Sequence, residues 1–333
     1  MSVPTDAPVV METEVLVIGA GPAGLYGAYY AGFRGLRTVV LDVLPQVGGQ
    51  VSAMYPEKPI LDIAGFPAVK GRNLVDNLLA QANQYKPTYL LGRRAVALVH
   101  DGEGRPVVHT DRGEAIRAEA VVITGGIGTF TPRPLPAGEA YLGRGLVYFV
   151  PDPDEHTGRD VVIVGGGDSA FDWAAALAPI ARSVRLVHRR DRFRAHRASI
   201  EHVRDLGIEI IVNAEVTALR GEGDVEAAEV RLRDGAVRVL QAQTVVAALG
   251  FTADLGPMEE WGLHLHARHI TVDTRMATNL PRVFAAGDIT DYPGKVRLIS
   301  VGFGEAATAV NNAATVIDPR AVLFPGHSTE KDT

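Results

Sequence analysis

The sequence is 333 residues long, with 47% hydrophobic residues, 36 glycines, 20 prolines and a formal net charge of −6. This length favours two compact units, and the acidic balance disfavours nucleic acid as the main partner. The chain contains no cysteine, which excludes disulfides, thiolate metal sites and redox-active dithiols. No apolar run approaches the roughly 20 residues of a membrane-spanning helix. We therefore expect a cytoplasmic protein whose redox chemistry, if any, depends on a bound cofactor.

A strand–helix–strand unit is predicted near the N-terminus. Residues 15–18 form a short apolar run that ends in glycines, as a buried strand does, and residues 22–33 form a helix with small residues on one side. A second strand at 38–41 ends at Asp42. Such a unit requires a parallel sheet that is covered by helices. A long irregular region, a helix at 72–85 and short strands within 95–123 follow.

A second unit of the same kind begins at Val161, after a connection rich in Gly, Pro and Thr at 124–138. Its pattern predicts helices at 169–177 and 198–206 and strands at 184–187 and 208–212. The pattern at 244–256 predicts that the chain crosses back from the second domain to the first. An apolar strand within 282–290 and a helix at 299–317 are predicted after it. The predicted fold class is α/β, with two Rossmann-like three-layer dinucleotide-binding domains, the second inserted into the first. One continuous large domain is the alternative.

Each unit contains a glycine turn between its first strand and its helix. The turns are Gly19-x-Gly21-x-x-Gly24 and Gly165-x-Gly167-x-x-Ala170. In this arrangement the first glycine permits a tight turn, the second lets the backbone approach a pyrophosphate, and the third position lets helix and strand pack closely. The helix N-terminus then offers free N–H groups to the anion. The alternative, that these glycines only shape loops, does not explain why strand and helix flank each turn.

The residue that ends the second strand differs between the two units. Asp42 lies 23 residues beyond Gly19, where an acid accepts hydrogen bonds from the ribose hydroxyls and repels a 2′-phosphate. The equivalent position, 23 residues beyond Gly165, is His188 at the start of "HRRDRFR". Its arginines suit a phosphate dianion, which predicts NADP rather than NAD in the second unit. A solvated basic surface is the alternative reading of this run.

FAD is the dinucleotide that we predict for the first unit. A chain that binds two dinucleotides for redox chemistry typically holds a flavin and exchanges the nicotinamide. The late segment "AAGD" ends in Asp288, which we expect to face the ribityl–pyrophosphate region of an extended FAD. An order of FAD, inserted NADP and FAD again also explains the two crossings between the domains.

The motifs GAGPAG, GGQ (48–50), GGGDSA, HRRDRFRA and AAGD follow one another at a spacing that resembles the thioredoxin reductase branch of two-dinucleotide flavoproteins. Thioredoxin reductases carry a Cys-x-x-Cys between the crossing and the second glycine turn, but 143–160 of this chain contains no thiol. The chain resembles more closely the ferredoxin–NADP+ reductases built on that scaffold. The segments that carry this resemblance are "AMYPEKPILDIAGFP" (53–67), "VYFVPDP" (147–153), "YPGKVRLISVGFGEAATAVNNA" and "DPRAVLFPGHST".

The resemblance implies a non-covalent FAD, a homodimer and a set of matched positions. Tyr55 matches an aromatic on one flavin face, and His327 matches the ring on the opposite face, on a C-terminal extension from about residue 318. With the first glycine turn, the FAD residues are Gly19, Gly21, Pro22, Ala23, Gly24, Asp42, Gln50, Tyr55, Val96, Phe130, Asp288 and Thr329. The NADP residues are Gly165, Gly167, Asp168, Ser169, Ala170, His188, Arg189, Arg190 and Arg194. Tyr55 and Phe130 as core aromatics, and His327 as a tail residue, are the alternatives.

The expected organisation is an FAD-binding domain from 1–126 and 253–333, with an NADP-binding domain at 127–252 inserted between these parts. The expected function is electron transfer between NADPH and ferredoxin or flavodoxin, by hydride transfer to flavin N5 and then single-electron steps. No catalytic side chain is strictly required for the hydride step. An NADPH-dependent flavin reductase for a quinone or another acceptor is the enzymatic alternative, and a non-catalytic NADPH sensor is the third.

Two further groups of residues bear on metal binding and on the docking of a partner protein. His264, His266 and His269 alternate along a predicted surface strand without an acidic or cysteine partner at ligand spacing, so we predict no metal site there. An acidic ferredoxin would need a local positive patch on this acidic chain. The candidates are Arg34, Arg37, Arg93, Arg94, Lys295 and Arg297.

Overall fold

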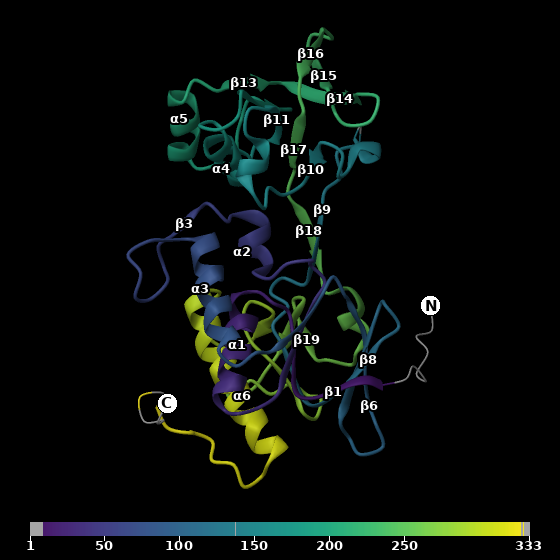
Figure 1. Ribbon diagram of the computed structural model, residues 1–333, viewed down its shortest axis with the longest axis vertical. Helices are drawn as coiled ribbons and strands as arrows, with labels where there is room; N and C mark the ends of the chain where they lie inside the picture. The colour runs from purple at the N-terminus through teal and green to yellow at the C-terminus, as the bar shows by residue number, and fades with distance from the viewer. Residues whose placement is uncertain (1–8, 137, 328, 330–333) are drawn as a thin grey trace. The chain divides into compact units, whose positions relative to one another are not determined.

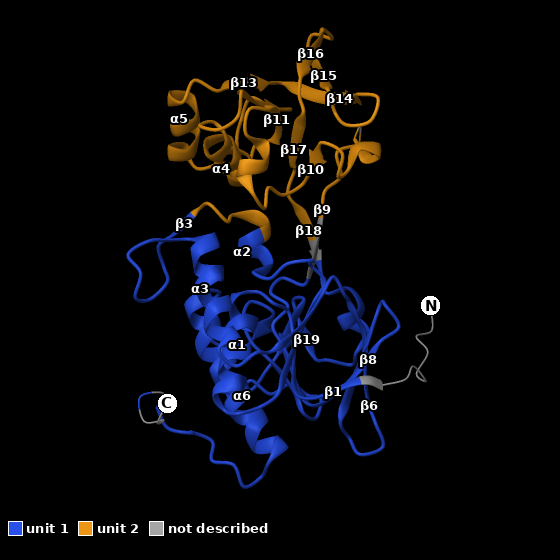
Figure 2. Ribbon diagram, in the orientation of Figure 1, with its two compact units in different colours: residues 1–52, 59–129, 253–333 blue, residues 53–58, 130–252 orange. Residues whose placement is uncertain are grey.

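The computed structural model describes residues 9–136, 138–327 and 329, and it divides the chain into two compact units. Unit 1 contains residues 1–52, 59–129 and 253–333, and unit 2 contains residues 53–58 and 130–252 (Figures 1 and 2). The prediction placed the first crossing at 126/127, and it did not anticipate that residues 53–58 group with unit 2.

A seven-stranded sheet forms the centre of unit 1. Its order is β5-β2-β1-β8-β7-β6, and β21 pairs with β8. The strands β1, β2, β5, β8 and β21 are mutually parallel, whereas β6, β7 and β8 form an antiparallel meander. Their bounds are β1 Val9–Ile18, β2 Thr38–Asp42, β5 Thr88–Leu91, β6 Ala95–His100, β7 Pro106–Thr110, β8 Ala115–Ile123 and β21 Val283–Ala285.

In unit 1, α1 packs against both α3 and α6, and α2 ends in residues that group with unit 2. The bounds of these helices are α1 Pro22–Phe33, α2 Gly49–Met54, α3 Gly71–Asn83 and α6 Ile299–Ile317. Small residues let α1 and α6 approach closely, since a Cβ added at Gly27 would lie 3.8 Å from Ala306 Cβ. Tyr26 and Phe303 fill the neighbouring space, with ring centroids 5.2 Å apart. The core therefore lies between the α1–α6 layer and strands β1, β8 and β21, whose central residues are buried.

Unit 2 contains a five-stranded parallel sheet of order β10-β17-β11-β12-β13. Its strands are β10 Leu146–Val147, β11 Asp160–Gly165, β12 Ser183–His188, β13 Glu209–Val212 and β17 Thr244–Ala248. The helices are α4 Asp168–Leu177 and α5 Arg197–Asp205. A separate antiparallel sheet consists of β14 Ala214–Arg220, β15 Ala227–Leu232 and β16 Val237–Gln241.

Short elements complete the chain. The two connections between the units are β9 Thr129–Pro132 and β18 Phe251–Asp254, which pair with each other. Small sheets consist of β3 Pro59–Ile60 with β4 Val69–Lys70, and of β19 Leu265–His266, β20 His269–Thr271 and β22 Thr290–Asp291. Single 3-10 turns are η1 Glu139–Tyr141, η2 Pro153–His156 and η3 Gly256–Glu260. Among the described residues, no helix is long and apolar enough to span a bilayer.

Candidate functional site

The first glycine turn lies between β1 and α1, and two of its three glycines have no space for a side chain. Gly19 has φ +113°, and a Cβ there would lie 2.5 Å from Thr124 O at the end of β8. A Cβ at Gly24 would lie only 1.8 Å from Gly19 O. The Thr124 hydroxyl donates to Gly19 O at 2.8 Å. These contacts hold α1 tightly against the sheet, so Gly19 and Gly24 serve packing within the protein.

Gly21 has a different environment from its neighbours. It is the N-cap of α1 and no side chain caps the helix, so the first N–H groups of α1 have no partner within the helix. A Cβ at Gly21 would find its nearest heavy atom, Gly49 Cα, 4.0 Å away. Gly48 N donates to Ala20 O at 2.8 Å, which places α2 and Gln50 beside the turn. Free N–H groups, open space and a helix N-terminus fit a pyrophosphate.

Asp42 ends β2 beside this turn. Its Oδ2 accepts from Ala20 N at 2.5 Å and its Oδ1 accepts from Leu44 N at 2.8 Å. Burial raises the pKa of Asp42, and the hydrogen bonds from Ala20 and Leu44 oppose that rise. A carboxylate that is fixed by backbone donors and retains acceptor capacity fits the ribose hydroxyls of an adenosine.

The connection between β5 and β6 passes the end of β2. Arg93 N donates to Asp42 O at 3.0 Å, and Gly92 N donates to Leu44 O at 2.9 Å. Val96 then lies at an irregularity in the β6–β7 pairing, because Ala95 and Ala97 have partners in β7 and Val96 has none. Such a bulge frees backbone groups from the strand ladder. The Val96 backbone therefore fits the predicted contact with adenine.

Asp288 follows β21 through Gly287, which lies against the start of α1. Gly287 has φ +83°, and a Cβ there would lie 3.2 Å from Ala23 Cβ. A Cβ at Gly302, in the first turn of α6, would lie 3.4 Å from Gly287 Cα and 3.5 Å from Ala23 Cβ. The turn that carries Asp288 thus meets the first turns of both α1 and α6. This position fits its predicted role beside the pyrophosphate.

The second glycine turn, between β11 and α4, repeats the geometry of the first. A Cβ at Gly165 would lie 2.3 Å from Ala248 O and 3.0 Å from Ala170 Cβ, so this glycine serves packing. Gly167 is the uncapped N-cap of α4 and has no heavy atom within 4 Å of an added Cβ. Asp168 Oδ1 accepts from His196 N at 2.9 Å, which ties the turn to the start of α5. The open position at Gly167 fits a second pyrophosphate.

The basic loop after β12 folds back over this turn. The His188 ring lies over Gly166, where an added Cβ would be 2.3 Å from His188 Cε1, and Arg194 N donates to Gly166 O at 2.8 Å. Burial lowers the pKa of His188; the hydrogen bond to Arg192 O opposes this, and the charges of the nearby arginines add to it. Arg189, Arg190 and Arg194 are exposed, and no ion pair within the described part of the chain engages them. They fit a 2′-phosphate.

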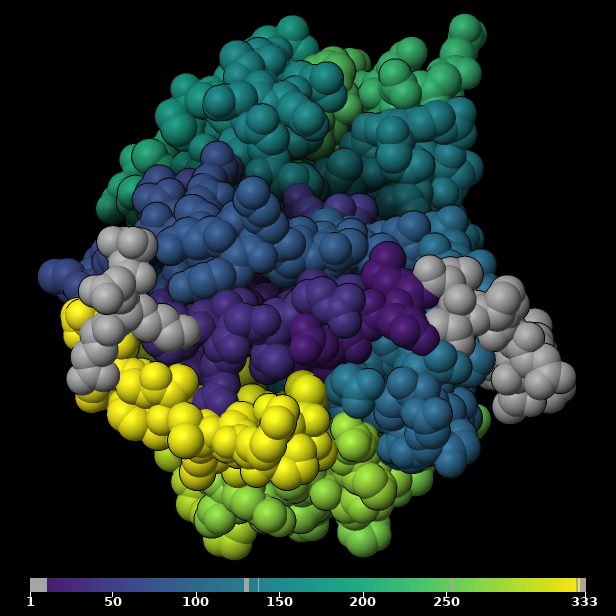
Figure 3. Space-filling view, turned by 60° about the horizontal axis from the view of Figure 1, so that its bottom comes forward, coloured from purple at the N-terminus to yellow at the C-terminus, as the bar shows by residue number. Residues whose placement is uncertain are grey.

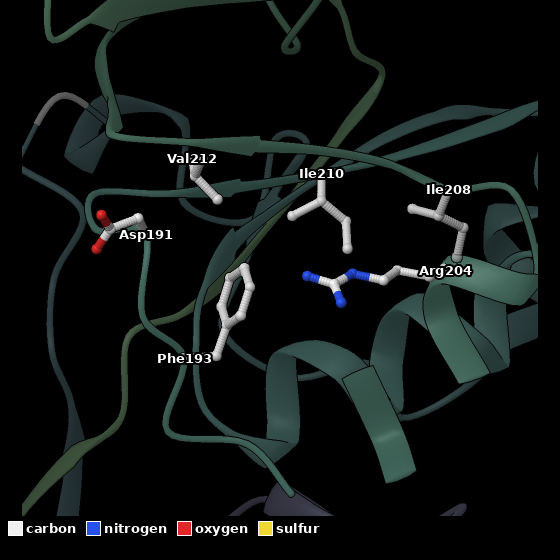
Figure 4. Close-up of a pocket in the computed structure, with 6 residues that line it drawn as sticks. All are labelled: Asp191, Phe193, Arg204, Ile208, Ile210 and Val212. Atoms are coloured by element: carbon white, nitrogen blue, oxygen red, sulfur yellow. The ribbon is translucent and has the colours of Figure 1, made fainter. Parts of the chain in front are cut away.

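A cavity of about 400 Å³ lies beside the basic loop of unit 2 (Figure 4). Phe193 from the loop and Arg204 from α5 point into it beneath Ile210, and its other lining residues are Asp191, Ile208 and Val212. Alternate residues of β13 supply the apolar wall, as they do where a helix covers a strand incompletely. Of the predicted site residues, none lines this cavity.

Four predicted FAD residues are not placed at the first turn. Tyr55 belongs to the segment 53–58 that groups with unit 2, where Lys58 Nζ lies 3.7 Å from Asp172 Oδ2. The side chain of Phe130 lies outside the described residues. His327 is exposed and packs edge-on against Phe324, with centroids 5.0 Å apart. Thr329 is also exposed. The flavin contacts of these four residues stay predictions.

The structure corrects the choice of Lys295 as a docking residue. Its side chain is only 2% exposed, and Nζ lies 2.5 Å from Glu305 Oε1. The structure also brings Asp291 to His266, with 2.6 Å between Oδ2 and Nδ1, although sequence spacing shows no acidic partner. Within the described ranges, no group of three His, Asp or Glu side chains could hold a metal ion.

Sequence reasoning missed residues that position the site without matching a nucleotide motif. Thr124 contacts the first turn, and Glu305 contacts Gly287. The sequence gives one indication of the role of Glu305. It is the only charged residue of α6, whose other residues are small, apolar or amide residues.

Together, these sites define a flavoprotein class that binds two dinucleotides, and comparison with known proteins identifies the family. The model of a protein family described as "Pyridine nucleotide-disulphide oxidoreductase" matches residues 13–313. A protein of Salinispora arenicola named "Ferredoxin--NADP reductase" is 66% identical and covers 96% of this chain and 99% of its own. One of the same name from Halalkalibacterium halodurans is 44% identical, covering 95% and 97%.

Solved structures agree on the fold. A thioredoxin reductase of T. acidophilum has a TM-score of 0.69 and 25% identity, covering 92% of this chain and 98% of its own. The Lactococcus lactis thioredoxin reductase has a TM-score of 0.67 and 23% identity, covering 92% and 99%. The chain belongs to the pyridine nucleotide-disulphide oxidoreductase family, in the branch of thioredoxin-reductase-like ferredoxin–NADP reductases. It is an oxidoreductase that uses FAD and NADPH.

Proposed function

We propose that this enzyme transfers electrons between NADPH and ferredoxin or flavodoxin, with FAD in unit 1 and NADPH in unit 2. The observation that carries the proposal is the combination of two open glycine turns with a chain that has no cysteine. No dithiol relay is available, so electrons must leave the protein from the flavin itself. The names of relatives that are up to 66% identical support ferredoxin as the acceptor.

Flavin suits this task because it accepts a hydride from NADPH at N5 and releases the two electrons singly, as an iron–sulfur acceptor requires. The protein contributes binding and orientation. The N–H groups at the start of α1 would hold the pyrophosphate, Asp42 would accept from the adenosine ribose, and the Val96 backbone would contact adenine. Asp288 would contact the region between the pyrophosphate and the ribityl chain, and Gln50 and Tyr55 would lie along the flavin. The hydride step strictly requires no side-chain acid or base.

Selection of NADPH over NADH rests on the basic loop of unit 2. Arg189, Arg190 and Arg194 hold the 2′-phosphate by charge-assisted hydrogen bonds. Arg194 N donates to Gly166 O and His196 N donates to Asp168 Oδ1, and these two bonds fix the C-terminal part of that loop against the glycine turn. The guanidinium groups are therefore attached to a positioned backbone, although they are exposed.

We also propose that the protein is a homodimer and that the C-terminal tail brings His327 over a flavin. Arg34, the C-cap of α1, donates to Val322 O and Leu323 O at 2.8 Å and to Asn311 Oδ1 at 2.6 Å. Figure 3 shows the yellow tail against this purple part of the chain.

Docking of an acidic ferredoxin depends on cations that the protein leaves accessible. Arg34 is bound to the tail and Arg93 Nε donates to both Glu114 oxygens, so neither guanidinium is freely available. Arg37 and Arg297 are more exposed, with side chains 75% and 41% accessible, and each has one acidic neighbour. We propose that these two arginines and Arg94 contribute to docking. Turnover with ferredoxin should then fall as salt rises, and a salt-independent rate would count against it.

The test of the proposed function compares acceptors at a fixed NADPH concentration. FAD-loaded enzyme is given ferredoxin, flavodoxin, a quinone or an artificial dye under anaerobic conditions. We expect kcat/KM for ferredoxin or flavodoxin to exceed that for the quinone. Rapid flavin reduction with quinone as the preferred acceptor would replace this proposal by the reductase for another acceptor. A flavin that NADPH does not reduce would indicate a sensor.

A further inference from the structure

A buried ion pair lies beneath the turn that carries Asp288. Lys295 Nζ lies 2.5 Å from Glu305 Oε1, and the two side chains are 2% and 5% exposed. Tyr292 completes the group, because its hydroxyl donates to Glu305 Oε1 at 2.5 Å and its ring lies 5.5 Å from Lys295 Nζ. Burial and the Glu305 carboxylate raise the pKa of Tyr292 to about 12, so this hydroxyl remains a donor at neutral pH.

Both charged side chains of the pair form hydrogen bonds with the backbone of Gly287. Gly287 N donates to Glu305 Oε2 at 2.7 Å, and Lys295 Nζ donates to Gly287 O at 3.0 Å. The Thr290 hydroxyl and Thr290 N also donate to the same carbonyl, at 2.7 and 3.0 Å. The N–H and C=O of Gly287 are thus each bonded to a charged side chain, and both side chains come from later in the sequence.

The position of Gly287 explains why such a constraint matters. Its φ of +83° is a conformation that suits glycine, and it packs between Ala23 of α1 and Gly302 of α6. A rotation of its peptide would therefore move Asp288, the next residue, relative to the N-terminus of α1. The α1 N-terminus and Asp288 are the two parts of the FAD site that come from opposite ends of the sequence.

A gain in folding stability does not by itself explain why the protein contains this buried ion pair. Removing two charges from water costs several kcal/mol each, and apolar side chains of similar volume often stabilise a protein equally well. A pair whose members bond to the N–H and the C=O of one residue instead restricts the two peptide groups on either side of that residue, as hydrogen bonds to charged groups do strongly. The expected benefit is a preorganised ligand site, which binds without ordering a loop.

We propose that Lys295 and Glu305 are positioning residues that fix the Gly287 peptide and thereby set how tightly the chain binds FAD. This inference rests on the FAD site proposed above. It is independent of the electron acceptor, because it concerns binding of FAD in the absence of NADPH and ferredoxin.

The test measures the dissociation constant of FAD with deflavinated protein, by quenching of FAD fluorescence, together with the thermal unfolding of the apoprotein. The double variant Lys295→Met/Glu305→Leu removes both anchors and leaves no buried charge. We expect its FAD dissociation constant to rise at least about tenfold, the loss typical of one charge-assisted hydrogen bond. The variant Lys295→Met/Glu305→Gln retains an acceptor for Gly287 N, so it should recover part of that affinity.

The matched control is Val108→Ala, a fully buried residue of β7 outside the FAD site. It destabilises the apoprotein by removing core volume, and its FAD dissociation constant should stay within about twofold of wild type. NADPH binding should be unchanged in every variant, because unit 2 is not altered. The proposal is overturned if the Met/Leu variant binds FAD within twofold of wild type, or if Val108→Ala weakens FAD binding equally.

Discussion

Substitution of Gly21 by Ala separates ligand binding from folding at the first glycine turn. Gly21 has φ −71° and ψ −178°, which any residue adopts, and an added Cβ finds 4.0 Å of clearance. The apoprotein should therefore fold normally. Its unfolding free energy should change by less than about 1 kcal/mol, because Ala restricts the unfolded chain more than Gly does but is the poorer residue at an N-cap.

FAD binding should weaken in the same Gly21→Ala variant. The methyl group would occupy the space through which the pyrophosphate approaches the N–H groups of α1. Each hydrogen bond to a charged group contributes about 1.5–3 kcal/mol, so losing one corresponds to about 10- to 150-fold weaker binding. Gly24→Ala should behave differently, since its Cβ would lie 1.8 Å from Gly19 O and must displace α1 itself. We expect it to lose apoprotein stability as well, by about 1–3 kcal/mol or more.

The assay is a fluorescence titration of deflavinated protein with FAD, paired with apoprotein melting curves. Gly167→Ala is the matched control, because its Cβ also meets open space but lies in unit 2. It should weaken NADPH binding and leave FAD binding unchanged. Wild-type FAD affinity in Gly21→Ala, or a Gly21→Ala apoprotein destabilised as much as Gly24→Ala, would refute the placement of the pyrophosphate at this turn.

Three further predictions concern the basic loop, the acid limb of stability and the tail. Arg189→Ala/Arg190→Ala should raise KM for NADPH by about 10- to 100-fold and leave KM for NADH nearly unchanged; equal changes for both nucleotides would contradict phosphate recognition. The hydrogen bond and charge of Arg182 lower the pKa of Asp160, so this pair stabilises the fold above about pH 4 and the contribution is lost as pH falls further. Asp160→Asn should therefore lower stability at pH 7 and flatten the acid limb of the unfolding profile, and a parallel shift of the whole profile would argue against it. Deletion of the residues after Phe324 should speed flavin reduction by NADPH and alter ferredoxin reduction in stopped-flow traces, whereas unchanged kinetics would show that the tail does not cover a flavin.

Local patterns in the sequence were sufficient to locate the main elements. The helix predicted at 22–33 has the same bounds in the structure, because glycines precede it and Pro22 starts it, a favourable first helical position. The helix predicted at 299–317 also has the observed bounds. Strands predicted at 15–18 and 184–187 are longer in the structure, because pairing extends them beyond their apolar centres. Each of these predictions depends on the chemistry of neighbouring residues.

Features that depend on distant parts of the chain could not be predicted in this way. Lys295 looks like a surface cation in "YPGKVRL", and only the folded chain shows that Glu305 and Gly287 O surround it. The contact of Thr124 with Gly19 O likewise joins residues 105 positions apart. The grouping of residues 53–58 with unit 2 also depends on packing, to which the Lys58–Asp172 ion pair contributes.

Anaerobic titration of the FAD-loaded protein tests the central claim most directly. NADPH should bleach the flavin absorbance stoichiometrically, NADH should do so only at much higher concentration, and added oxidised ferredoxin should restore the colour. A protein that does not take up FAD, or whose flavin NADH reduces as readily as NADPH, would contradict the assignment of the two sites. A reduced flavin that ferredoxin and flavodoxin both fail to reoxidise would contradict the proposed electron acceptor.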